Sequence, residues 1–449
     1  MKIKIFRKKF SMTNCTSKPF TFSRLNSKKV EASFSGGTIT SDGGLLLVRE
    51  VDKKFGITKR LSKLLSDRRN SDYITHTYCD MLRQRIYGLA AGYEDVTDHD
   101  KLRLDPAFQT MVSREEDLAS ASTLSRFENS VTRDDCLRMS LGLVEHFIGQ
   151  HKTVPNELIL DFDPTDYLLY GDQESKHYHG YYSDYCYLPL YVFCGEHLLV
   201  SYLRPSDIDG ALHAGAILKL LVKRFRQVWP NVRIQFRADS GFTRRPILHW
   251  CEHNSVDYVV GMAQNKRILK LVEPTLQRAK STFEQTETKQ KEFISFEYAA
   301  ESWNYQRRIV TKVEYNSHGS NIRCVVTNLS EPTAESIYNE HYCLRGDMEN
   351  QIKQQKLDLF ASRVSCQRFM ANQFRVLLSA YAHVLLASLR QVGLGGTKLA
   401  NSYYATMRNK LFKIGAIVIK NTRRIQFLFS AHYTEQELFE GIVQKLVPG

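Results

Sequence analysis

The feature that most constrains the fold is an alternation of strand and helix patterns that begins at the apolar segment 158–163, Leu-Ile-Leu-Asp-Phe-Asp. Short apolar runs bounded by turn residues predict strands, and apolar residues at spacings of three and four predict helices. The order along the chain is three strands, a helix, a strand, a helix and a strand. These elements cover residues 158–163, 187–193, 198–203, 210–227, 233–238, 245–253 and 258–262.

This order predicts an α/β fold, a mixed sheet with helices on both faces, because strands and helices each bury an apolar face against a neighbouring layer. It is the order of the RNase H-like fold, in which the fourth strand lies beside the first. After residue 265 the pattern changes, and a charged helical stretch with three strands predicts a β-rich insertion. A helix at 339–355 then resumes the alternation, and an apolar helix at 369–389 should pack behind it.

Helical patterns precede the sheet, and a mixed tail follows it. Asp42 is expected to cap a helix that begins at Gly43 or Gly44, and the tail beyond residue 410 predicts two strands and a final helix. The expected segments are a basic arm (1–40), a helical DNA-binding region (41–150), the first part of the RNase H-like core (151–265), the β-rich insertion (266–335), the second part of the core with its late helix (336–395) and a C-terminal region (396–449).

An excess of basic residues favours a polyanionic partner. The 449 residues include 62 Lys and Arg against 48 Asp and Glu, a net charge of +14, and counterion release drives sequence-independent binding to nucleic acid. Residues 1–30 hold nine Lys or Arg and no acid. This start indicates either a DNA-contacting arm or a tail without function.

The cysteines and the apolar runs bear on compartment and membrane. Nine cysteines are scattered singly, without the paired spacing of a zinc site, which favours a reduced, cytoplasmic compartment. No run resembles a signal peptide or reaches the length of a membrane-spanning helix, so we expect no membrane partner. His177 and His179 lack a second ligand pair, and Ser240 lacks the Gly-x-Ser-x-Gly context of a nucleophile, so neither zinc nor a serine enzyme is expected.

Two strands of the expected sheet end in acids. The period of two places Asp161 and Asp163 on one face of the first strand. Asp163 precedes Pro164, which should end the strand, so we rank it above Asp161 as a metal ligand, although either could simply cap the next turn. Asp239 ends the fourth strand before a sharp turn, where α/β sheets place ligand-facing groups. Carboxylates from different elements suit Mg²⁺, and two such ions about 3.5–4 Å apart stabilise both oxygens of a phosphodiester exchange.

The late helix carries Tyr342, Arg345, Glu349 and Lys356 on one stripe. At about 100° per residue these positions fall within roughly 60° of arc. Glu349 can complete the metal site, and Arg345 and Lys356 stand about 6 Å and about 10 Å from it along the axis, where they can clamp phosphates. Tyr342 could position the terminal nucleotide. The alternative is a solvated charged face.

This constellation resembles the DDE transposases of bacterial insertion sequences, the cut-and-paste group marked by Tyr-x2-Arg-x3-Glu-x6-Lys, here running from Tyr342 to Lys356. Asp163-Pro-Thr and Asp239-Ser-Gly-Phe resemble the group's first two motifs, and the likeness covers about residues 41–386. The resemblance implies cleavage at terminal inverted repeats and transfer of the 3′ ends to target double-stranded DNA. It also implies a homodimer in a synaptic complex that uses Mg²⁺, with Mn²⁺ as a substitute.

Two further residues are candidates for DNA contacts. Arg126 lies in the capped helix start at 122–129 and could reach a phosphate or a base edge, whereas an ordinary surface arginine is the alternative. In some relatives of this group an aromatic residue of the insertion stabilises a flipped base while a hairpin end forms. Trp303 is the candidate here, and core packing is its alternative.

Three functions fit the sequence. The first is a transposase, a metal-dependent DNA endonuclease and strand transferase acting on element ends. The second is a stand-alone RNase H-like nuclease, and the third is a non-catalytic DNA-binding derivative. Long additions around the core, with Arg345 and Lys356 flanking Glu349, favour the first. The presence of all three acids disfavours the third.

Overall fold

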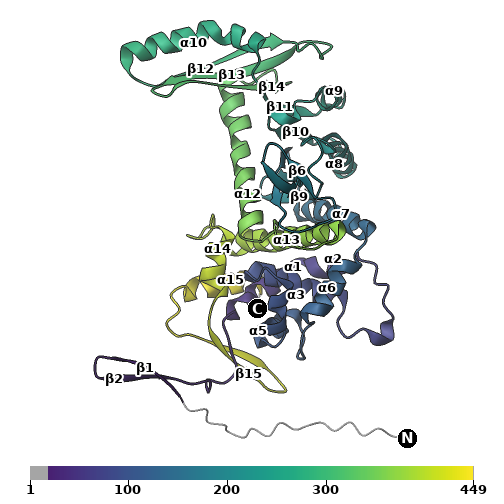
Figure 1. Cartoon of the computed structure of the whole chain (residues 1–449), viewed down its shortest axis with the longest axis vertical. Helices are drawn as coiled ribbons and strands as arrows, with labels where there is room; N and C mark the ends of the chain where they lie inside the picture. Colours follow the sequence, from purple (N-terminus) through teal and green to yellow (C-terminus); the bar gives the residue numbers. More distant parts are fainter. Residues whose placement is uncertain (1–18, 448–449) are drawn as a thin grey trace.

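The computed structural model describes residues 19–447, and its centre is an eight-stranded mixed sheet in the order β12-β13-β14-β11-β10-β4-β8-β9 (Figure 1). The strands of the described chain are β1 (Phe20–Leu25), β2 (Lys28–Ala32), β3 (Ile39–Thr40), β4 (Glu157–Pro164), β5 (Tyr167–Leu168), β6 (His177–His179), β7 (Asp184–Tyr187), β8 (Leu190–Cys194), β9 (His197–Tyr202), β10 (Arg233–Ala238), β11 (Asp257–Met262), β12 (Gln290–Tyr298), β13 (Arg307–Asn316), β14 (Gly319–Thr327), β15 (Ala416–Lys420) and β16 (Ile425–Phe429).

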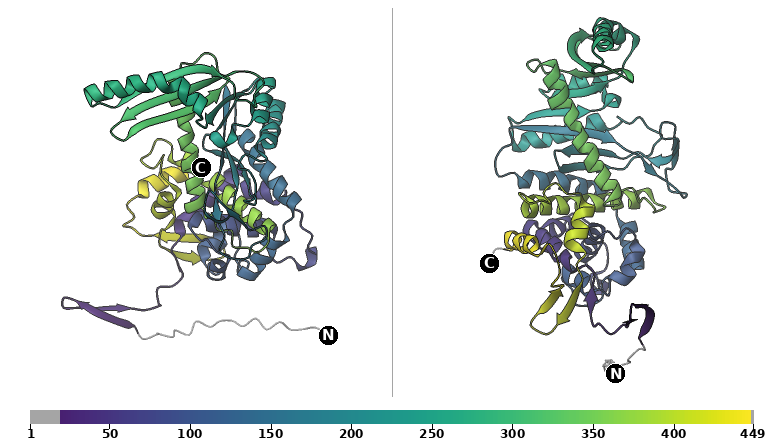
Figure 2. Two further views of the ribbon diagram at one scale, coloured as in Figure 1. Left: turned by 45° about the horizontal axis from the view of Figure 1, so that its top comes forward. Right: turned by 90° about the vertical axis from the view of Figure 1, so that its left-hand side faces the viewer.

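The α-helices surround this sheet and form a second body beneath it (Figures 1 and 2). They are α1 (Leu46–Phe55), α2 (Ile57–Ser62), α3 (Tyr78–Ala91), α4 (His99–Leu102), α5 (Pro106–Val112), α6 (Ala121–Ser130), α7 (Arg133–Gln150), α8 (Ala214–Val228), α9 (Arg245–His253), α10 (Lys266–Thr286), α11 (Ala334–Ser336), α12 (Gly346–Leu357), α13 (Phe369–Leu389), α14 (Tyr404–Met407) and α15 (Gln436–Leu446).

The five strands β9-β8-β4-β10-β11 have the RNase H-like arrangement. Strand β10 runs parallel to β4 and β11, whereas β8 pairs antiparallel with β4 and β9. Their side chains alternate between two apolar clusters: Leu160 and Phe162 of β4 pack with α8 and α9, and Tyr191 and Phe193 of β8 pack with α12 and α13. The predicted mixed sheet with helices on both faces is confirmed, and the acids of β4 point to the α12 face because they alternate with Phe162.

The second predicted strand differs from the structure in one respect. The expected strand at 187–193 is interrupted at Leu188 and Pro189, because proline has no N–H to donate to a ladder. Its first residue, Tyr187, ends β7, which belongs to a separate small sheet of β5, β7 and β6. His177 and His179 lie in β6 rather than in a loop.

The β-rich insertion is continuous with the core sheet rather than a separate unit. Its three strands were predicted correctly, but β14 pairs antiparallel with β11, from Val259–Thr327 to Met262–Cys324, and so extends the sheet. Val259 and Val325 pack with Ile337 and Tyr338. The apolar edge strand β11 is therefore covered by the insertion instead of being exposed.

The N-terminal and C-terminal regions form one body. Strand β3 pairs with β15, which pairs with β16, and the apolar cores of α1, α3, α13 and α15 merge in one cluster. Asp42 does not cap a helix as expected; its buried carboxylate accepts hydrogen bonds from Tyr93 and from Lys413 in the C-terminal region, at 2.8 and 2.6 Å. Asp42 thus connects segments that are distant in sequence.

Helix α13 is the central helix of this body. The helical run Phe369–Leu394 is long and apolar enough, by length and composition alone, to cross a membrane. This finding corrects the expectation that no run of the sequence reaches the length of a membrane-spanning helix. However, 83% of its most apolar window is buried inside the fold. Its apolar surface is therefore accounted for by protein packing.

Gly44 marks the closest approach between the two terminal regions. A Cβ atom built on Gly44 would lie 1.8 Å from the carbonyl oxygen of Leu411. We therefore expect Gly44→Ala to lower the free energy of unfolding by roughly 3 kcal/mol, because backbone cannot move aside as a flexible side chain can. Gly180→Ala is the control, since nothing lies within 4 Å of its Cβ position. Urea denaturation that finds the two variants equally stable would contradict this packing.

Candidate active site

Asp163 and Asp239 lie at neighbouring strand ends on one edge of the sheet. The parallel register pairs Asp161 of β4 with Arg237 of β10, so Asp163 and Asp239 each follow two residues later. Asp239 is fixed by the start of a 3-10 turn, because its Oδ1 accepts a hydrogen bond from the Gly241 N–H at 2.8 Å. The two acids predicted from separate motifs are therefore brought together.

The late helix is less regular than predicted. A π-helical turn (Ile337–Tyr342) and a 3-10 turn (Cys343–Arg345) precede α12, so the signature stripe is not carried by one straight α-helix. Irregular turns of this kind are frequent at functional sites. Here the Tyr342 hydroxyl lies where a Cβ on Gly261 would approach it to 2.7 Å. The absence of a side chain at Gly261 leaves room for the phenol, whose pKa is raised by burial.

Arg345 joins two of the predicted acids. Its Nη2 donates to Asp163 Oδ1 at 2.8 Å, and its Nη1 donates to Glu349 Oε1 at 2.6 Å. Burial raises the pKa of Asp163 to about 6; the charge of Arg345 opposes this shift, while Asp239 and Glu349 add to it. The three acids therefore share one electrostatic site in which a single guanidinium incompletely compensates the negative charge.

The donor chemistry of this site suits a hard divalent cation. Asp163, Asp239 and Glu349 offer carboxylate oxygens, which Mg²⁺ and Mn²⁺ prefer. Within residues 19–447, no group of three or more His, Cys, Asp or Glu side chains is gathered closely enough to hold a metal ion as it stands. Because Arg345 lies between Asp163 and Glu349, its guanidinium takes the place of a cation there, and it bonds one oxygen of each carboxylate and leaves the other.

Asp161 has a different role from Asp163. Its buried carboxylate forms a two-pronged ion pair with Arg237, through Nε and, at 2.7 Å, through Nη2. Arg237 also donates from Nη1 to the carbonyl oxygen of His341 at 2.5 Å. This placement favours Asp163 over Asp161 as a ligand. Sequence reasoning missed Arg237, although its position two residues before Asp239 put it on the same face as Asp161.

Lys356 lies beside the segment that follows the first acid. Its Nζ donates to Thr165 Oγ1 at 3.2 Å and to Asp166 Oδ1 at 3.0 Å. Arg126 lies elsewhere, exposed on α6 in the helical body, where it donates to Thr123. Of the predicted DNA-contacting side chains, Tyr342, Arg345 and Lys356 gather at the acids and Arg126 does not.

Trp303 is packed in the core of the insertion. It is 9% exposed, its ring centroid lies 5.9 Å from that of Tyr298, and the guanidinium of Arg307 lies 4.8 Å from it. These contacts favour core packing, the alternative given for Trp303, and stacking on a flipped base stays a prediction.

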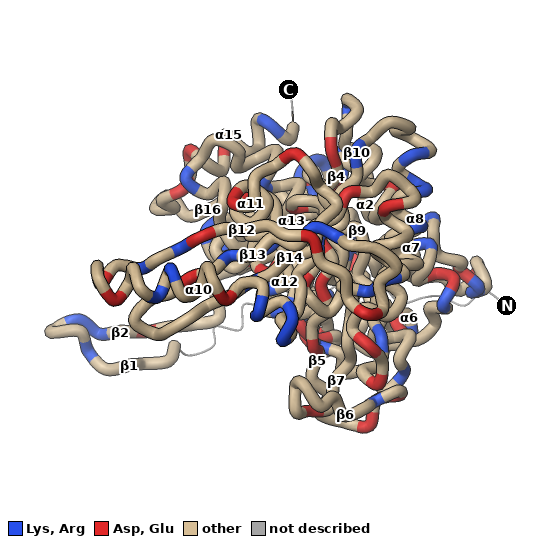
Figure 3. Tube along the Cα trace, turned by 90° about the horizontal axis from the view of Figure 1, so that it is seen from above, with Lys and Arg blue, Asp and Glu red and all other residues tan. Residues whose placement is uncertain are grey.

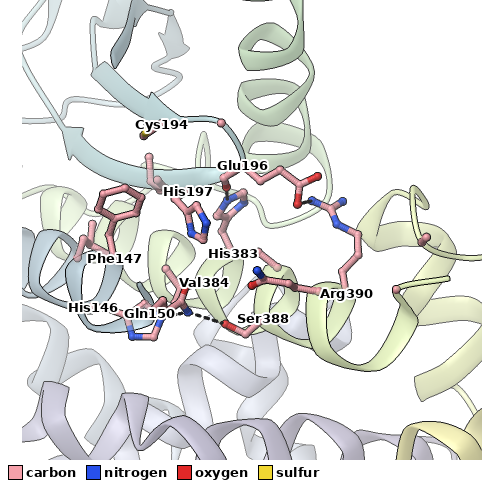
Figure 4. Close-up of a pocket in the computed structure, with 17 residues that line it drawn as sticks. His146, Phe147, Gln150, Cys194, Glu196, His197, His383, Val384, Ser388 and Arg390 are labelled. Atoms are coloured by element: carbon pink, nitrogen blue, oxygen red, sulfur yellow. Dashed lines mark hydrogen bonds and ion pairs between the residues drawn. The ribbon is translucent and has the colours of Figure 1, made fainter. Parts of the chain in front are cut away.

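A cavity lies between the β8–β9 turn of the sheet and helices α7 and α13, and none of the predicted acids lines it (Figure 4). His146, His197 and His383 line it. Both ring nitrogens of His383 already have partners, the carbonyl oxygen of Glu196 and the hydroxyl of Tyr404, and burial lowers its pKa to about 3. These are the properties of a neutral histidine that stabilises the core.

An RNase H-like sheet with acids at two neighbouring strand ends and a third on the late helix is the arrangement expected of a DDE recombinase. The sequence model of the family Transposase DDE domain group 1 matches residues 22–448. The chain therefore belongs to this family of DDE transposases. The match confirms the predicted class and does not single out the bacterial insertion-sequence group.

No curated protein sequence matches the chain. Among solved structures, the chain is similar to a piggyBac transposase in a synaptic complex with hairpin DNA, at 13% identity and a TM-score of 0.41, over 91% of this chain and 87% of that one.

The buried Asp161–Arg237 pair can be tested by stability. Arg237→Met should lower the free energy of unfolding by about 3–5 kcal/mol, because a buried carboxylate is left without its partner. The double variant with Asp161→Leu should recover most of this loss. Arg233→Met, which removes an exposed ion pair from the same strand, should cost less than about 1 kcal/mol. Urea denaturation without DNA measures all three, and a double variant no more stable than Arg237→Met would argue against the pairing.

Proposed function

We propose that this transposase cleaves double-stranded DNA at the terminal inverted repeats of a mobile element and transfers the 3′ ends to target DNA. The observation that carries the proposal is Arg345, which is bonded at once to Asp163 of β4 and Glu349 of α12 beside Asp239. One cation thus already bridges acids from two elements. In this proposal Mg²⁺ or Mn²⁺ is held by Asp163, Asp239 and Glu349.

The side chains around the acids have separate tasks. When bound, divalent metal ions supply charge stabilisation to the attacking and leaving oxygens of a phosphodiester. The Gly241 N–H orients Asp239. Arg345 keeps Asp163 and Glu349 paired before DNA arrives, and then turns to a phosphate, for which its planar fork of donors is suited.

Lys356 and Tyr342 extend the site along the DNA. Lys356 is held by Thr165 and Asp166, so its ammonium is placed next to the strand end that carries Asp163 and can bind a neighbouring phosphate. Tyr342 positions the terminal nucleotide in this scheme. It stands on the other side of Arg345, next to Gly261.

Both the net charge of the chain and its transposase family support DNA as the partner. The net charge is +14, and Lys and Arg occur throughout the trace, in the helical body as well as in the sheet domain (Figure 3). A spread of this kind suits long duplex ends held by phosphate contacts. We assign the helical body, with Arg126, to binding the repeats, and propose a homodimeric synaptic complex and a cytoplasmic location.

Glu349→Gln tests the chemistry. It removes one charge with little change in shape, so cleavage of a duplex carrying the element ends should fall by about 10²–10³-fold, a magnitude typical when an electrostatic group of a catalytic site is removed. Binding to the same duplex should persist. Asp347→Asn is the matched control, an exposed acid two residues away on the same helix. Cleavage by Glu349→Gln at the rate of the control would contradict the assignment of Glu349 to the catalytic site.

Lys356→Ala tests the phosphate contact. The logarithm of the binding constant for cleaved ends falls with the logarithm of salt concentration, and loss of one phosphate contact should flatten this slope by about one. Lys353→Ala, an exposed lysine on the same helix, is the control for net charge alone. Fluorescence anisotropy across a salt series gives both slopes. Equal slopes for the two variants would remove Lys356 from the DNA contact.

A further inference from the structure

The hairpin of β1 and β2 has one apolar face that is open to solvent. Its register pairs Phe20 with Ala32 and Phe22 with Val30, so these side chains share a face while Thr21 and Glu31 share the other. The Phe20 and Phe22 side chains are 54% and 57% exposed. Phe34, 91% exposed, packs edge-on against Phe20 with ring centroids 5.8 Å apart. The hairpin projects away from the helical body (Figures 1 and 2).

A second exposed apolar face lies on the small sheet of β3, β15 and β16. The register aligns Ile417 with both Ile39 and Leu428, and these three side chains are 45%, 55% and 44% exposed. Ile419, two residues further along β15, is 45% exposed on the same side. The alternate residues Ala416 and Val418 are buried in the body, so the exposed face is a regular feature of the strand.

We propose that the hairpin of one copy docks, by its Phe20–Phe22 face, on the β3–β15–β16 face of a second copy, and that the second hairpin docks reciprocally on the first. A two-stranded hairpin without support is marginally stable in water, and its apolar face needs a cover. Each chain carries both the β1–β2 hairpin, called the arm below, and an apolar β3–β15–β16 face that can receive it. A two-fold axis then satisfies both faces of both copies at once.

The connection between the hairpin and β3 favours a second copy over the same chain. Phe34 belongs to the hairpin's apolar face, and the carbonyl oxygen of Thr38 is fixed by the Val418 N–H at 2.8 Å. Residues 35–37 alone remain to turn the hairpin, and the four Cα–Cα steps from Phe34 to Thr38 span about 14 Å when fully extended. Packed sheets are themselves about 10 Å apart. Folding back onto the same chain's face would consume most of this reach and leave about one residue for the reversal.

The area available is adequate for a stable dimer. The three phenylalanine rings of each arm are 54%, 57% and 91% exposed, which together equals about two full aromatic side chains of about 150–250 Å² each. Two arms, with an equal area covered on the receiving faces, bury about 1,200–2,000 Å², the size of a standard interface. The exchange does not depend on catalysis, so it stands or fails separately from the proposed DNA cleavage.

Cross-linking between differently labelled chains tests the arm exchange. A chain carrying Ala32→Cys, which keeps the phenylalanines of the apolar face, is mixed with a chain carrying Gln426→Cys, which lies opposite Ile419 on the receiving face, and the mixture is oxidised mildly. We expect a disulfide-linked heterodimer on a non-reducing gel. A chain with Thr21→Cys, on the opposite face of the hairpin, is the matched control and should give at least about tenfold less product. No product above this control would overturn the proposal. So would a disulfide that forms only within a chain carrying both Ala32→Cys and Gln426→Cys.

Sedimentation measurements on the full chain without DNA give an independent answer. The wild type should dimerise with increasing concentration, and Phe22→Ser should weaken dimerisation by ~tenfold or more, as for a buried aromatic anchor. Ser23→Ala on the opposite face should not. A wild type that stays monomeric would overturn the exchange. Protection of the hairpin from proteolysis by DNA alone, with the protein still monomeric, would also overturn it and identify the hairpin as a DNA contact.

Discussion

The structure of the site depends on one buried ion pair, between Asp161 and Arg237. It joins the two central parallel strands, and the remaining Nη1 of Arg237 reaches the carbonyl oxygen of His341 in the turn before the signature helix. A charge at this depth is tolerated only when paired and hydrogen-bonded, so strands β4 and β10 and the late helix are held in one relative position. Asp163 and Asp239 lie two residues further along the strands than the lower layer of Asp161 and Arg237, and form an upper layer with Arg345. The charge of the lower layer is neutralised within the protein, whereas the upper layer keeps surplus negative charge.

That surplus separates the candidate active site from a purely structural ion pair. In the lower layer a single acid meets a single guanidinium, whereas in the upper layer three acids share Arg345, and burial with mutual repulsion raises the pKa of Asp163 to about 6. Such an arrangement costs stability in the isolated protein and is relieved when a cation or its equivalent is added, which is the usual compromise between folding and activity. The same reasoning explains why Arg345 is drawn between Asp163 and Glu349 and why its partners are expected to change when DNA binds.

Local patterns were sufficient for the central strands and for the placement of Asp163 and Asp239 at neighbouring strand ends, but not for contacts between distant segments. The strand at 233–238 and the helix at 369–389 follow directly from short apolar runs and from apolar periodicity, and both coincide with β10 and α13. Asp163 and Asp239 were located because acids at strand ends interrupt an apolar pattern. The pairing of β14 with β11, the π turn before Arg345 and the bond from Lys413 to Asp42 were not foreseen. Each depends on which partner a segment meets in space, and Trp303 shows the same limit, because a sequence does not tell an exposed ring from a packed one.

The position of the small terminal sheet links the proposed dimer to the proposed chemistry. Helix α12 runs from the large sheet down to the helical body, and β15 lies at the far end of that body from β12 (Figure 1). Met348 and Ile352 of α12 pack in the apolar cluster of the body, while Glu349 on the same helix meets Arg345 at the acids. Helix α12 therefore connects the apolar cluster of the body to the acids. Two copies joined at β3, β15 and β16 would leave both sets of acids uncovered, so DNA ends could be held by the bodies and cut at the sheets without competition between the two contacts.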